Sequence, residues 1–120
     1  MGHGNAADRA ALESQRLLAL DRVRTMASEV AGLAGDSSDA NGDDEHDPEG
    51  STVAYERARV AALLAEAESN LSALDLALEK LAAGTYAVCE ECGSSISGQR
   101  LEALPAARRC FACASGRAPR

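Results

Sequence analysis

The sequence lacks tryptophan, and aromatic residues make up only 2% of its 120 positions. Its hydrophobic residues, 46% of the chain, are largely alanine and leucine, which suit helix packing more than a globular sheet core. The sequence contains no run of 18 apolar residues, which argues against a membrane span. Its N-terminus lacks the basic and apolar regions of a signal peptide. We therefore expect one mainly helical, cytoplasmic protein.

Lysine and arginine are absent from residues 36–50, although the chain contains 12 of them. This segment holds seven of the 19 acidic residues and so accounts for the whole formal net charge of −7. The seven are Asp36, Asp39, Asp43, Asp44, Glu45, Asp47 and Glu49. An acidic chain is a poor candidate for direct, sequence-specific DNA binding. By charge pattern alone, a run of this kind is usually a solvated linker.

Cysteine is scarce and confined to one segment, where Cys89, Cys92, Cys110 and Cys113 form two C-x-x-C pairs. The 17 residues between the pairs match the spacing of a four-thiolate zinc ribbon. Each pair would lie on a tight turn that points two sulfurs at one Zn²⁺, so that four thiolates surround the metal. Four thiolates leave no position for water or substrate, so we predict one structural zinc. Two disulfides or a redox pair are the alternatives, but a cytosol keeps thiols reduced and no βαβ setting is visible.

Two long heptad patterns precede the cysteines. The first runs from about Ala6 to Leu33, and its apolar stripe comprises Leu12, Ala19, Met26 and Leu33 with Arg16, Val23 and Val30. The second runs from a cap at Ser51 or Thr52 to about Ala83, and its stripe comprises Val53, Val60, Leu64, Ala67, Leu71, Leu74, Leu78 and Leu81 with Arg57. Gly32 and Gly35 predict the end of the first helix, and Gly84 predicts the end of the second.

Each apolar stripe must be covered by another surface. The simplest cover is the other helix, folded back as an antiparallel coiled-coil hairpin, although pairing between chains into a dimer or bundle would also cover it. We predict four regions: a disordered N-terminus at 1–5, a hairpin at 6–84 with an acidic tip loop at 34–51, a small four-cysteine zinc finger at 85–114, and a basic tail at 115–120. Ile96 and Leu101 are the expected apolar packing residues of the zinc finger.

The cysteine segment reads GTYAVCEECGSSISGQRLEALPAARRCFAC from Gly84 to Cys113. It resembles the zinc finger of the DksA/TraR family of bacterial RNA polymerase-binding transcription regulators. The matching features are the Gly-x-Tyr before the first cysteine, the CEECG sequence, Ile96, the Arg-Leu-Glu-Ala run from Arg100, Pro105 and the closing C-x-x-C. The HDPEGST stretch at 46–52 and the helix after it extend the resemblance toward the N-terminus.

The resemblance implies binding to RNA polymerase through its secondary channel, with the coiled-coil tip near the catalytic centre. The family's tip pattern is Asp-Pro-x-Asp-x-Ala, and Asp47 followed by Pro48 matches its start. Glu49 either replaces the second acid or that acid is missing. Asp44 and Glu45 are the other tip candidates.

Arg100, Arg108 and Arg109 make the cysteine segment basic, so we consider them candidate polymerase contacts. Ordinary solvated surface is the alternative interpretation. DksA-type members use cationic residues near the finger to bind guanosine tetraphosphate, and this sequence has Leu104 and Ala114 at those positions. We therefore do not expect that nucleotide at the zinc end.

Two other functional classes compete with a polymerase-binding regulator. A zinc-stapled coiled-coil module for another protein partner would need the same cysteines and helices. An enzyme is not indicated, because the sequence shows no nucleophile–base set, phosphate loop or open metal site.

Overall fold

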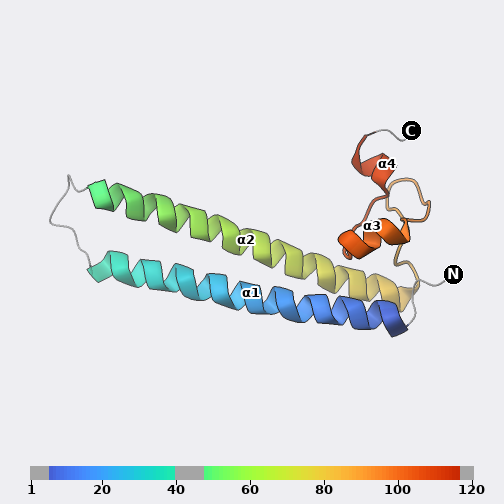
Figure 1. The fold of residues 1–120 in the computed structure, drawn as a ribbon, viewed down its shortest axis with the longest axis horizontal. Coiled ribbons are helices and arrows are strands. Elements are labelled where there is room, and N and C mark those ends of the chain that lie inside the picture. Colours follow the sequence, from blue (N-terminus) through green and yellow to red (C-terminus); the bar gives the residue numbers. More distant parts are fainter. Residues whose placement is uncertain (1–5, 40–47, 117–120) are drawn as a thin grey trace. The chain divides into compact units, whose positions relative to one another are not determined.

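The computed structural model describes residues 6–39 and 48–116, and this part of the chain is mainly α-helical, as predicted. Its helices are α1 (Ala6–Asp39), α2 (Pro48–Ala83), α3 (Gly98–Ala103) and α4 (Phe111–Ala114) (Figure 1). Within these described residues the β contacts amount to one isolated antiparallel bridge, between Val88 and Ser95. None of the helices in the described ranges is long and apolar enough to cross a membrane.

The chain divides into two compact units. The hairpin unit is Leu18–Leu71, and the zinc unit combines Met1–Leu17 with Ser72–Arg120. Each long helix contributes one segment to each unit.

The hairpin unit is held by the predicted seam. The segments of α1 and α2 lie side by side and antiparallel (Figure 1). Its most buried side chains are Ala19, Met26, Val60 and Ala67. All four were predicted seam positions, and small residues such as these alanines let the two helix backbones approach closely. Arg57, the polar seam residue, is half-buried, and its Nε atom is buried without a hydrogen-bond partner.

Within the zinc unit, the predicted stripe residues Leu12, Leu74 and Leu81 are buried, and Leu12 is fully buried. Arg16, the charged residue of the first helix's stripe, donates from Nε to the Asp75 carboxylate on α2. This ion pair is partly exposed, so its net contribution to stability is small. The pair nevertheless gives Arg16, the one cation in the first helix's stripe, a carboxylate partner.

The two long helices extend further than predicted. The expected loop at 34–51 is helical at both ends, because α1 continues to Asp39 and α2 begins at Pro48. Proline suits a first helical position, where its missing N–H would have no partner. Glycine ends a helix when it adopts positive φ, as Gly84 does at 82°, with its N–H donating to Leu81 O. Gly32 lacks a positive φ and remains helical, at a cost of about 1 kcal/mol relative to alanine.

Leu74→Asp tests the seam in the zinc unit. Leu74 is only 3% exposed, so a carboxylate there would be buried without a partner and should destabilise the protein by about 3 kcal/mol or more. The change is measured as a lower midpoint of thermal unfolding, followed by circular dichroism. Ser72→Asp is the matched control, because Ser72 is exposed on the same helix. Equal midpoints for the two variants would contradict the burial of this seam.

Candidate metal centre

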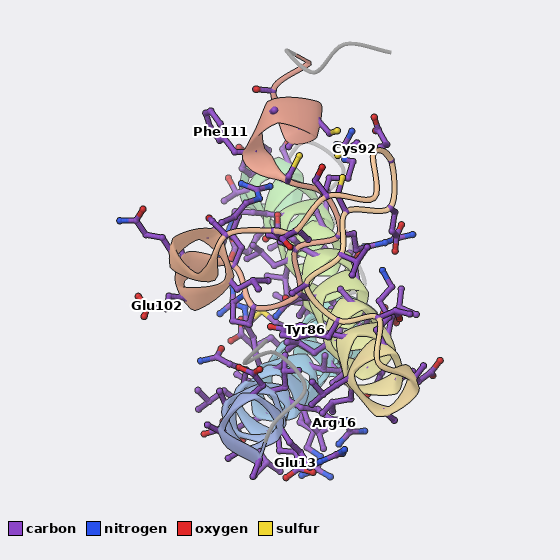
Figure 2. All side chains as sticks on the ribbon, turned by 90° about the vertical axis from the view of Figure 1, so that its right-hand side faces the viewer. Glu13, Arg16, Tyr86, Cys92, Glu102 and Phe111 are labelled. Atoms are coloured by element: carbon purple, nitrogen blue, oxygen red, sulfur yellow. The ribbon has the colours of Figure 1, made fainter. Side chains whose placement is uncertain are left out.

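Four cysteine side chains meet in the zinc unit. The Sγ atoms of Cys89, Cys92, Cys110 and Cys113 all lie within 4.8 Å of one another, and those of Cys92 and Cys110 are 3.8 Å apart. Figure 2 shows Cys92 close to α4, the helix that carries Cys113. Sulfurs bound at about 2.3 Å from a tetrahedral zinc would lie about 3.8 Å apart. The cluster therefore fits one structural Zn²⁺.

Backbone geometry forms the first knuckle. Cys89 N–H donates to Ser94 O over 2.8 Å, and Gly93 N–H donates to Cys89 O over 3.0 Å. Gly93 has a φ of 77°, a conformation in which a Cβ would be strained. A residue with a side chain at this position would therefore be strained by its backbone conformation, although its Cβ would meet no neighbouring atom.

The second knuckle leads directly into α4. Cys110 precedes this helix as its N-cap in an extended conformation, and Ala114 N–H donates to Cys110 O over 2.9 Å. Gly116, with a φ of 77°, donates its N–H to Cys113 O over 3.1 Å. One helical turn thus brings Cys110 and Cys113 to the same side.

The pKa values of the cysteine thiols are shifted in opposite directions within the cluster. Backbone N–H groups of Cys92 and Cys110 donate to Cys89 and lower its pKa to about 6. Burial raises the pKa of Cys113 to about 12. Zinc coordinates thiolates, and its charge offsets the desolvation that disfavours a thiolate at Cys113. A bound cation would therefore favour the thiolate form of Cys113.

Charged side chains join the two knuckles. Glu90 and Glu91 lie between the first two cysteines, and Arg108 and Arg109 directly precede Cys110. Arg108 Nη2 lies 2.9 Å from Glu90 Oε1, and Arg109 Nη1 lies 2.8 Å from Glu91 Oε2. The Glu90 N–H also donates to Arg108 O over 2.9 Å. We call these two ion pairs the knuckle clamp.

Glu90 also contacts α2, because its carboxylate pairs with Lys80 in the last turn of that helix. Hydrogen bonds from Arg108 and Lys80 lower the pKa of Glu90 to about 2, so this side chain is ionised at neutral pH. One carboxylate thus links α2 to both knuckles.

The predicted polymerase contacts have partners in this chain. Arg108 and Arg109 belong to the knuckle clamp, and Arg100 Nε donates to Arg109 O over 2.9 Å. Sequence reasoning missed Glu90 and Glu91 as their partners. The signal was available, because an acidic pair inside one C-x-x-C and a basic pair beside the other have matching charge. Contact of these arginines with a polymerase stays a prediction.

The remaining site predictions fall near the connection between α1 and α2. Asp44, Glu45 and Asp47 lie outside the described residues, and so does the side chain of Glu49, although its backbone belongs to α2.

A small apolar core supports the cluster. Ile96 is 1% exposed and Leu101 is 7% exposed, as predicted, and Tyr86 is buried beside them. The Tyr86 hydroxyl donates to Pro105 O over 2.8 Å, so its polar end is satisfied. Ser97 caps α3 by accepting a hydrogen bond from Arg100 N–H over 3.1 Å.

Comparison with known proteins gives matches to both parts of the chain. Residues 84–117 match the prokaryotic dksA/traR C4-type zinc finger. The structure resembles that of transcription factor DksA2 from Pseudomonas aeruginosa, with a TM-score of 0.61 and 25% sequence identity. This likeness covers 95% of this chain and 85% of DksA2, so it includes the helices as well as the finger.

Three curated proteins are similar in sequence. General stress protein 16O of Bacillus subtilis is 33% identical over 99 residues, which are 81% of this chain and 57% of that protein. An uncharacterized protein of Aquifex aeolicus is 48% identical over 46 residues, or 38% of this chain and 32% of that protein. Uncharacterized protein YteA of Bacillus subtilis is 38% identical over 64 residues, which are 53% of this chain and 27% of that protein. The matches thus span between about a quarter and three fifths of these relatives.

Cys92→Ser should release the metal. The wild-type chain is expected to hold one zinc atom by elemental analysis, and the variant should hold little, because three thiolates remain. Most of the helical circular dichroism should persist, since the α1–α2 seam contains none of the cysteines. Ser95→Ala, in the same exposed loop, is the control and should keep its zinc. Full zinc content in Cys92→Ser would refute the four-thiolate site.

Glu90→Gln tests the link between the knuckles and α2. Glu90 has two cationic partners and Glu91 has one, so Glu90→Gln should transfer zinc to a chelator several times faster than Glu91→Gln at pH 7. The measurement is the rate of zinc transfer to a chromogenic chelator. If the two variants lose zinc at the same rate, Glu90 has no special role in holding the knuckles.

Proposed function

Because the chain belongs to the DksA/TraR family of C4-type zinc-finger proteins, we propose that it is a transcription regulator that binds bacterial RNA polymerase. The observation that carries this proposal is the likeness to DksA2 over 95% of the chain. A zinc finger alone would equally suit an interaction module for another protein. The long paired helices are shared with DksA2 too, and they favour the polymerase. The protein would act as a regulator and not as an enzyme, in the cytoplasm, where the polymerase is found.

We further propose that the hairpin unit enters the secondary channel of the polymerase. The connection between α1 and α2 would then approach the catalytic centre, carrying the acidic segment 36–50. A channel lined with basic groups around a magnesium-bearing site would attract this charge. Asp47 would act at the active site with Glu49 behind it, and Asp44 and Glu45 would add to the local field.

The zinc unit would contact the outer part of the polymerase. Arg108 and Arg109 are about half-exposed despite their pairing in the knuckle clamp, so each guanidinium can also donate to a carboxylate of the polymerase. Guanosine tetraphosphate would not bind here with the affinity of DksA-type members. Leu104 is half-exposed where they carry a cation, and the phosphates need cationic partners.

Retention by purified core polymerase in the absence of DNA is the first test. Wild-type protein should be retained, and it should change the yield of transcripts from promoters in a purified system. If polymerase does not retain it and transcription is unaffected, the chain is a module for a different partner.

Asp47→Asn tests the proposed role of the tip. It should abolish the effect on transcription while reducing polymerase binding little, because binding would rest on the helices and the zinc unit. Asp36→Asn is the matched control, since it removes one charge from the same segment and should be nearly silent. Equal, small effects of the two substitutions in the transcription assay would show that the segment is only an acidic linker.

A further inference from the structure

The zinc unit contains a hollow of about 510 Å³ that plays no part in holding the metal. Residues of α1, α3 and the segments around Tyr86 and Pro105 line it, and all of them belong to this one unit. Its volume lies within the range typical of ligand pockets. Figure 2 shows Glu102 at the outer edge of α3 and Tyr86 nearer the middle of the view, with α1 below them.

The apolar part of the lining is rigid. Leu12 is fully buried and Leu101 is 7% exposed, so neither side chain can turn away. Tyr86 is held by the hydrogen bond from its hydroxyl to Pro105 O. Burial and, to a smaller extent, the Asp8 charge raise the pKa of Tyr86, which indicates that the Asp8 carboxylate lies in the electrostatic neighbourhood of this ring.

The charged part of the lining has one sign. Asp8 and Glu102 contribute carboxylates, and among the described residues that line the hollow there is neither lysine nor arginine. Asp8 already makes an interaction within the chain, so an incoming ligand would share it. A phosphate or carboxylate ligand would be repelled here, whereas a cation would be attracted.

An arginine side chain matches both parts of this lining. Its aliphatic stem can cover the exposed Ala11 and the half-buried Pro105, which also line the hollow, and its planar guanidinium can pair with carboxylates. A bare metal ion would leave the apolar lining uncovered. We propose that the hollow receives an arginine side chain of the partner protein, whose guanidinium pairs with Glu102 and Asp8. This inference rests on the proposed function, in which the partner is RNA polymerase.

The first experiment uses the zinc-loaded full chain and a small probe. Nα-acetyl-arginine amide is titrated while backbone amide signals are followed by NMR. Saturable shifts are expected at Ala11 and Gly98, with a dissociation constant on the order of 1 mM, and none at Gly32 in the hairpin unit. The corresponding citrulline derivative, which is neutral and nearly the same shape, should produce no saturable shifts. Equal shifts with both probes would overturn the proposal. If spermidine binds more tightly than the arginine probe, the ligand of the hollow is a free polyamine and not an arginine side chain, which would also overturn it.

The second experiment measures affinity for core polymerase. Glu102→Gln should weaken binding about fivefold to tenfold, and Asp8→Asn should do the same. Glu13→Gln is the matched control, because Glu13 is an exposed acid of α1 that does not line the hollow (Figure 2). Glu102 is itself exposed, so zinc content and thermal stability should be unchanged in its variant. Equal affinities of Glu102→Gln and Glu13→Gln would overturn the proposal.

The two experiments separate this inference from the proposed function. If wild-type protein binds polymerase and Glu102→Gln binds equally well, the hollow is not the contact and the proposed function stands. If wild-type protein does not bind polymerase, the proposed function is wrong. Arginine-specific shifts that Glu102→Gln abolishes would then still support a hollow that receives an arginine, but from a different partner protein.

Discussion

The meeting of four cysteine sulfurs is the constraint on which the zinc unit depends. The segment after α2 has one small apolar core around Ile96, Leu101 and Tyr86, and so short a segment cannot bury enough surface to fold by that means alone. Zinc binding in small peptides contributes on the order of 10–16 kcal/mol of folding free energy. Three features are arranged around the four-cysteine cluster: the tight turn at Gly93, the N-cap at Cys110 and the knuckle clamp.

The hairpin unit is stabilised differently. Its seam consists of alanine, valine, leucine and methionine, and most of its side chains are only partly covered. Such a seam excludes water along a line and not within a globular core. The half-buried Arg57, whose Nε has no partner, is a weak point in it. This unit relies on length and regular spacing, whereas the zinc unit relies on a few strong contacts.

Charge is organised in three ways along the chain. The acidic segment 36–50 carries the net charge, the arginines beside Cys110 pair with the glutamates beside Cys89, and the hollow presents carboxylates alone. The basic character that the arginine count suggests for the zinc finger is therefore largely compensated within the finger itself. A partner would meet acidic groups at the hollow as well as the half-exposed guanidinium groups of the clamp. This mixed surface suits an interface in which charges of both signs set the register.

The sequence by itself determined the features that depend on local spacing. The two C-x-x-C pairs predicted the four-cysteine cluster, and Gly84 predicted the end of α2. The heptads of the long helices predicted the buried positions from Leu12 to Leu81. Only the tertiary structure decided which residues meet across long separations. It paired Arg16 with Asp75 and Glu90 with Arg108, and it brought Asp8 and Glu102 to one hollow. It also carried the first helix past Gly32. Periodicity and composition record how a residue relates to its neighbours in the chain, whereas these contacts depend on how helices and knuckles are placed in space.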